Sequence, residues 1–118
     1  MTIAVAVTNS AEGRIALEYA AHEASLFGEE LLAVNLTDAE LDPSTTNGQP
    51  FEVVVPPSND LDEVDAVLQV LDERTDVSRL VVGVRKRSPV GKAILGSIAQ
   101  RLILEAPLPV LAVKARTP

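Results

Sequence analysis

Short apolar runs alternate along this chain with segments of helical periodicity. The run from Ile3 to Val7 is rich in β-branched residues, which is typical of a strand buried on both faces. Ser10 is placed to cap a helix that ends near Phe27, with Gly28 just beyond it. The residues that share one face of this helix are Ala16, Leu17, Ala20, Ala21, Ala24 and Phe27. Their small side chains predict a helix that lies close to a sheet.

The rest of the chain repeats this alternation, with one exception. Strands are predicted at 30–36, 51–55, 80–83 and 110–113, and a helix is predicted from Gly96 and Ser97 to about Glu105. Another helix follows the third strand, with Ser58, Asn59 or Asp60 as its cap. Segment 37–50 has turn chemistry and no helical period, so it is predicted to be a loop. We therefore expect one α/β domain over residues 1–118, with a five-stranded, mainly parallel, doubly wound sheet whose helix between strands two and three is shortened or absent.

Composition and charge exclude several classes of function. The chain has no cysteine and a single histidine, so disulfides and zinc clusters are not expected, and no metal is required. The net charge of −7 disfavours nucleic-acid binding. No apolar stretch is long enough to span a bilayer and the start lacks a basic leader, so we expect a cytoplasmic protein without membrane contact. Ser10 and Ser97 lack nucleophile spacing and lie far from His22, so we expect helix capping and no enzyme activity.

Positive charge is nevertheless concentrated in one place. Four of the ten basic residues fall within the eight residues 85–92. In a doubly wound sheet, ligands bind at the carboxyl ends of the strands where the strand order reverses, which points to 8–10 and 83–97. Gly83 permits close backbone approach, and Gly96 with Ser97 presents free amides at a helix start. These features predict a site for a small anion; the alternative is that the glycines only make turns and the basic loop is solvated.

The second half of the chain carries a recognisable series of motifs. They are Leu80-Val81-Val82-Gly83, Arg87-Ser88-Pro89-Val90-Gly91-Lys92, Ile94-Leu95-Gly96-Ser97-Ile98-Ala99-Gln100-Arg101 and Pro109-Val110-Leu111-Ala112-Val113-Lys114. This ending resembles that of the universal stress protein family, in a short form similar to actinobacterial members. The resemblance implies the adenine nucleotide alpha hydrolase-like α/β fold, a homodimer through the last strand (Val110 to Val113) and, in some members, bound ATP or AMP.

The family's nucleotide-binding pattern is glycine, two residues, glycine, nine residues, glycine and then serine or threonine. Gly83 matches its first position and Gly96-Ser97 its last, whereas Lys86 stands at the second glycine. Thr8 replaces an aspartate that often ends the first strand of family members, and Asn35 ends the strand beside the adenine wall. The candidate ligand-binding residues are Val7, Thr8, Asn9, Ser10, Asn35, Gly83, Arg85, Lys86, Gly96 and Ser97.

Two functions follow from these features. The first is a stress-response binding module with an adenine-nucleotide or anion site at the carboxyl edge of the sheet. The alternative is a structural or interaction protein of the same fold that acts through dimerisation and has lost nucleotide binding. Thr8, Lys86 and the shortened middle of the chain would allow the alternative, since Thr8 and Lys86 depart from the family pattern at the same site. The Lys86 side chain either obstructs a triphosphate or holds a shorter phosphate by its charge, and the sequence leaves both open.

Overall fold

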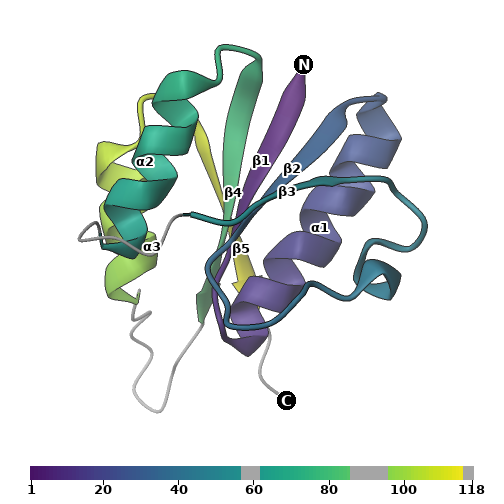
Figure 1. Cartoon of the computed structure of the whole chain (residues 1–118), viewed down its shortest axis with the longest axis horizontal. Coiled ribbons are helices and arrows are strands. Elements are labelled where there is room, and N and C mark those ends of the chain that lie inside the picture. Colours follow the sequence, from purple (N-terminus) through teal and green to yellow (C-terminus); the bar gives the residue numbers. More distant parts are fainter. Residues whose placement is uncertain (57–61, 86–95, 116–118) are drawn as a thin grey trace.

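The computed structural model describes residues 1–56, 62–85 and 96–115 (Figure 1). The predicted alternation of strands and helices is confirmed over these ranges. The elements, in chain order, are β1 (Thr2–Val7), α1 (Ala11–Phe27), β2 (Glu30–Asn35), the short 3₁₀ helix η1 (Pro43–Thr46), β3 (Glu52–Val54), α2 (Glu63–Glu73), β4 (Val77–Arg85), α3 (Ser97–Glu105) and β5 (Val110–Ala115).

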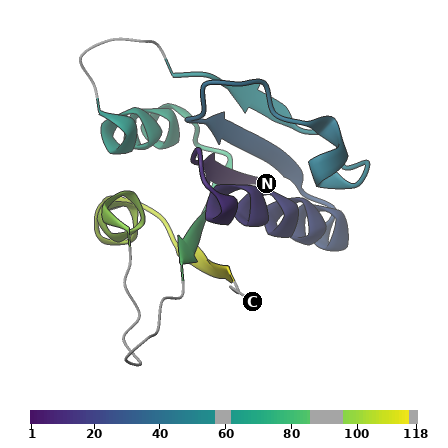
Figure 2. The same ribbon diagram turned by 90° about the horizontal axis from the view of Figure 1, so that it is seen from below.

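The five strands form one parallel sheet in the order β3-β2-β1-β4-β5. Helices α2 and α3 cover one face and α1 covers the other (Figures 1 and 2). The predicted doubly wound α/β fold is therefore confirmed. Between β2 and β3 only η1 is helical, as the turn-rich composition of that segment predicts.

Alternate residues of the strands supply two cores, because successive strand side chains point to opposite faces. Ala4 and Ala6 of β1 pack with α2 and α3, whereas Ile3, Val5 and Val7 pack with α1. Helix α1 contributes mostly alanines to its core, so its backbone lies close to the sheet. The central strand is consequently buried on both faces along its whole length.

The ends of α1 follow the sequence prediction closely. The Ser10 side chain accepts a hydrogen bond from the Gly13 amide, and Gly28 ends the helix in the left-handed conformation with φ of 66°. Phe27 differs from the prediction, since 60% of it is exposed. It lies in the last turn of α1, where its ring contacts the guanidinium of Arg79 at 5.7 Å.

Other boundaries also differ from the sequence prediction, by one residue at the ends of β1, β2 and β3 and by more elsewhere. Helix α2 begins at Glu63, and its cap is Asp62, whose carboxylate accepts a hydrogen bond from the Asp65 amide at 2.8 Å. Ser58, Asn59 and Asp60 are therefore not the cap, and they lie outside the described residues. Strands β4 and β5 are longer than their apolar runs, because polar residues at their ends continue the pairing of the ladder.

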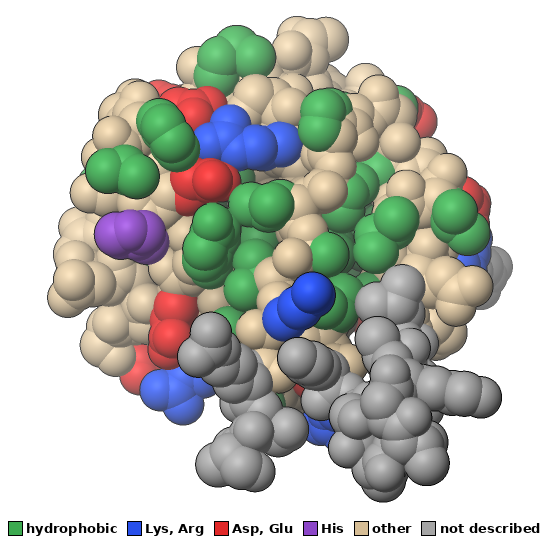
Figure 3. Space-filling view, turned by 180° about the vertical axis from the view of Figure 1, so that it is seen from behind, with side chains coloured by type: hydrophobic (Ala, Val, Ile, Leu, Met, Phe, Trp, Pro, Cys, Tyr) green, Lys and Arg blue, Asp and Glu red, His purple; other side chains and the backbone are tan. Residues whose placement is uncertain are grey.

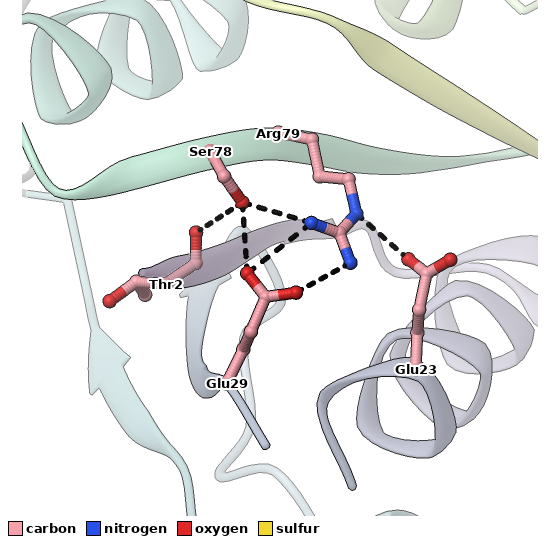
Figure 4. A network of polar contacts seen from close by, with 5 residues as sticks. All are labelled: Thr2, Glu23, Glu29, Ser78 and Arg79. Atoms are coloured by element: carbon pink, nitrogen blue, oxygen red, sulfur yellow. Dashed lines mark hydrogen bonds and ion pairs between the residues drawn. The ribbon is translucent and has the colours of Figure 1, made fainter. Parts of the chain in front are cut away.

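A group of polar and charged side chains lies at the amino edge of the sheet, where the strands begin. Arg79 of β4 contacts Glu29, just before β2, at 2.9 Å and Glu23 of α1 at 3.0 Å, and Ser78 lies beside them (Figure 4). Both glutamate side chains are only 16% exposed. Because Arg79 donates to Glu29, it holds the pKa of that carboxyl below its usual value.

A second group of contacts extends this edge toward β3. Arg74 at the end of α2 pairs with Asp76 at 3.1 Å and with Glu52 of β3 at 3.2 Å. The Thr2 hydroxyl of β1 donates to Asp76 at 2.7 Å. Arg74 first, and then Thr2, holds the pKa of Asp76 far below its usual value. The amino ends of β1, β2, β3 and β4 are thus tied together by polar contacts.

Strand β5 is the outermost strand of the sheet on the side of β4, and Figure 3 views the molecule from the side on which β5 lies. Hydrophobic side chains gather in the middle of this view. Val110, Leu111 and Val113 of β5 are each partly exposed, and Ala112 is exposed. Within the described ranges, no helix has the length and apolar character needed to cross a bilayer.

Candidate functional site

The strand order reverses between β1 and β4. The chain runs from β1 outward to β2 and β3, and then returns to the other side of β1 to form β4 and β5. Such a reversal leaves a crevice at the carboxyl ends of the two central strands. A cavity of about 520 Å³ lies there. The described residues that line it are Ala6, Thr8, Asn9, Ser10, Glu12, Glu63, Val82, Gly83, Arg85, Gly96, Ser97, Ile98, Ala99 and Leu102.

The cavity brings together most of the residues that the sequence singled out. Those that line it are Thr8, Asn9, Ser10, Gly83, Arg85, Gly96 and Ser97. Val7 does not line it, because its side chain is buried in the core beneath α1. Lys86 lies outside the described residues. Two segments more than seventy residues apart in the chain therefore meet at one site.

Asn35 has a different role from the one predicted. Its side chain is buried, its amide nitrogen donates to the Ala39 carbonyl at 2.9 Å, and its oxygen accepts from the Thr37 amide at 2.9 Å. These bonds use both ends of the amide group to hold the turn after β2. Asn35 does not line the cavity.

The hydroxyl groups of Thr8 and Ser10, which follow β1, are hydrogen-bonded to each other. Thr8 Oγ1 and Ser10 Oγ lie 2.7 Å apart, and Ser10 Oγ also accepts from the Gly13 amide at 3.1 Å. The prediction that Ser10 caps α1 is confirmed. This arrangement fixes the direction in which the chain enters the helix, so that the first turn of α1 forms one wall of the cavity.

Two glycines allow that first turn to lie against the sheet. A Cβ on Gly83 would overlap the carbonyl of Glu12, and a Cβ on Gly13 would lie 2.7 Å from the Thr8 amide nitrogen. Close backbone approach at Gly83 was predicted from the sequence, but the group that approaches is helix α1. Gly13 was not singled out, since a glycine inside a helical segment gives no sign of what packs against it.

The sequence reasoning also missed Glu12, which faces Arg85 across the cavity wall. Glu12 Oε2 lies 3.5 Å from Arg85 Nε, and the two side chains are 17% and 49% exposed respectively. Among the described residues, this buried oxygen has no partner with hydrogen-bond geometry. An acidic residue in a first helical turn is common because it suits the helix dipole, so the sequence offered no reason to select it.

The amino end of helix α3 forms part of the cavity lining. Its cap is Gly96, with φ of −64° and ψ of 156°, and no side chain in the described part of the chain caps the helix. Ser97 is the first helical residue and not the cap, which corrects the prediction that its hydroxyl performs this role. Among the described residues, the first amides of α3 thus have no side-chain acceptor, and such amides attract anions.

Arg101 fixes α3 against the start of α2. It contacts Asp62 at 2.9 Å and Glu105 at 2.9 Å. The Asp65 amide and then Arg101 hold the pKa of Asp62 below its usual value. Because both helix starts line the cavity, this contact sets the distance across its outer wall. In the described parts of the chain, no group of three or more His, Asp or Glu side chains is placed to hold a metal ion.

Comparison with known proteins agrees with this architecture. A family model described as the universal stress protein family matches residues 49–114. A universal stress protein from Mycolicibacterium smegmatis is 40% identical, over 86% of this chain and 88% of that protein. The resemblance to actinobacterial members is therefore confirmed.

Solved structures share the fold over nearly the whole chain. A universal stress protein from Archaeoglobus fulgidus has a TM-score of 0.71 at 30% identity and covers 97% of this chain and 98% of its own. Another from that organism, in complex with dAMP, has a TM-score of 0.66 at 24% identity, with coverage of 97% and 98%. A universal stress protein in complex with cAMP has a TM-score of 0.63 at 20% identity, with coverage of 96% and 95%. By its family match, its relative and its fold, this chain belongs to the universal stress protein family.

Proposed function

We propose that this chain is a stress-response binding module that holds an adenine nucleotide, or a simpler anion, in the cavity between β1 and β4. The observation that carries the proposal is the meeting of Thr8 to Ser10, Arg85 and the uncapped start of α3 around about 520 Å³ of space. That volume is in the range of small-molecule sites. Related structures in complex with dAMP and cAMP support the choice of an adenine nucleotide.

The proposal is for binding without catalysis. His22 is an exposed residue of α1 and does not line the cavity. Ser10 caps a helix, and its hydroxyl has Thr8 as its side-chain neighbour instead of a base. We therefore propose that the protein is not an enzyme. Action in the cytoplasm stays a prediction from the sequence.

Thermal unfolding with and without ligands tests the binding proposal. AMP, ADP, ATP, cAMP and sulfate are added in turn to the wild type and to Gly96→Val. A Cβ at Gly96 meets no atom within 4 Å, so the variant should fold, while its larger side chain occupies the entrance to α3. We expect a nucleotide to raise the unfolding temperature of the wild type and not that of the variant.

Ala39→Val is the matched control, because Ala39 is exposed and does not line the cavity. It should retain the full ligand response. Stabilisation by sulfate alone would indicate a general anion site. No stabilisation by any ligand would contradict the proposal and favour the alternative of an interaction protein without a nucleotide.

We also propose that the protein forms a homodimer through β5. The partly exposed Val110, Leu111 and Val113 lie on the outermost strand, on the face where hydrophobic side chains gather in Figure 3. An apolar edge strand of this kind favours pairing with a second chain. Light scattering at tens of micromolar should give twice the chain mass, and Leu111→Asp should reduce it to one. A wild-type monomer would exclude the dimer.

A further inference from the structure

The cavity wall contains a carboxylate whose position is set by backbone packing. The absence of a Cβ at Gly83 lets the Glu12 carbonyl rest against β4, and the absence of a Cβ at Gly13 lets the same turn rest against Thr8. The first turn of α1 therefore cannot shift without breaking two backbone contacts. The side chain of Glu12 leaves this fixed turn and forms part of the cavity lining.

Arg85 neutralises this carboxylate only in part. The two groups are within ion-pair distance, at 3.5 Å, but Arg85 is 49% exposed and Glu12 is 17% exposed. Water screens the guanidinium more than the carboxylate, so the negative charge is the better enclosed of the two. Glu63, at the start of α2, adds a second carboxylate to the described lining.

An enclosed negative charge acts on ligands according to the charge they carry. A ligand with several phosphates is repelled more strongly than one with a single phosphate, since Coulomb energy grows with the product of the charges. We propose that Glu12 is a specificity-determining residue that makes the cavity favour an adenine nucleotide with one phosphate over a di- or triphosphate. This inference rests on the proposed function, because it names the nucleotide class that the site takes.

Titration calorimetry with AMP, ADP and ATP tests this role in the wild type, in Glu12→Gln and in Glu18→Gln. Glutamine keeps the shape of Glu12 and removes its charge. Glu18 is the matched control, because it lies on the same helix and outside the cavity, in an exposed pair with Arg14. We expect wild-type affinity to fall from AMP to ATP. Glu12→Gln should raise ATP affinity about tenfold and AMP affinity about threefold, and Glu18→Gln should change both by less than about twofold.

Equal wild-type affinities for AMP and ATP would overturn the inference and leave the proposed function intact. An unchanged ratio of the two affinities in Glu12→Gln would do the same. If no adenine nucleotide binds the wild type or Glu12→Gln, the site is not a nucleotide site, and the proposed function is reduced to a site for a simpler anion. Inorganic phosphate and tripolyphosphate then test whether Glu12 selects ligands by charge. In thermal unfolding, Glu12→Gln should be stabilised by tripolyphosphate more than the wild type is; equal stabilisation would show that Glu12 selects no charge.

Discussion

The amino and carboxyl edges of this sheet differ in how fully their charged and polar groups are paired within the protein. At the amino edge, Arg79 and Arg74 contact the carboxylates of Glu23, Glu29, Asp76 and Glu52. At the carboxyl edge, within the described residues, Arg85 has the single partner Glu12 at 3.5 Å, and no side chain caps α3. Polar groups that are satisfied within the protein stabilise it, whereas groups left open can be satisfied by a ligand. The first edge therefore supports the fold, and the second is suited to binding.

The largest expected effect comes from the close contact between β4 and α1 at the carboxyl edge. Gly83→Ala should lower the free energy of unfolding by about 3 kcal/mol, because its Cβ overlaps the Glu12 carbonyl and α1 must move. Urea unfolding measures the change. Gly96→Ala is the control, since its Cβ meets nothing within 4 Å. Similar stabilities for the two variants would show that α1 does not rest on β4.

Removing Arg79 should weaken the amino edge. Arg79→Met leaves the carboxylates of Glu23 and Glu29 without the cation that they share, which should cost about 2 kcal/mol of unfolding free energy. Arg14→Met is the matched control, because Arg14 is 74% exposed and its pair with Glu18 should contribute little. If urea unfolding gave equal losses for both, the amino edge would not be the stabilising one.

Lowering the pH should reduce the free energy of unfolding through the same edge, by less than Arg79→Met does. Arg79 lowers the pKa of Glu29 in the folded state, so this carboxylate stabilises the fold above its unfolded pKa of about 4. That contribution is lost as pH falls through the lower, folded pKa. The urea midpoint should therefore decrease below about pH 4, and less steeply in Glu29→Gln. An identical pH profile for Glu29→Gln would contradict this role.

The smallest expected effect comes from adding a side-chain cap to α3, which should change stability and ligand binding in opposite directions. Gly96→Ser offers a hydroxyl to the open amides of α3 and should stabilise the protein by about 0.4 kcal/mol. It should also weaken ligand-induced stabilisation, because the new cap competes for the same amides. Thermal unfolding with and without AMP measures both changes. Unchanged ligand-induced stabilisation in this variant would mean that the α3 amides do not contact the ligand.

Local pattern alone was sufficient to predict the order and type of the elements. The apolar run of β1, the Ser10 cap and the Gly28 terminus are signals carried by adjacent residues. The meeting of Thr8 to Ser10 with Gly83, Arg85 and Gly96 was also predictable, since parallel strands end at one edge and ligands bind where their order reverses. The family resemblance rested on motifs of the same local kind.

Contacts between distant residues could not be predicted in this way. Nothing in the sequence near Gly83 indicates that its missing side chain makes room for Glu12, or that Glu12 shares the cavity with Arg85. Asn35 had the right position at a strand end, but its side chain is used by the turn that follows. The sequence by itself determined the elements and the edge at which the site lies, because those depend on neighbouring residues. Only the tertiary structure decided which side chains face the cavity, because that depends on how α1 and α3 pack against strands far away in the chain.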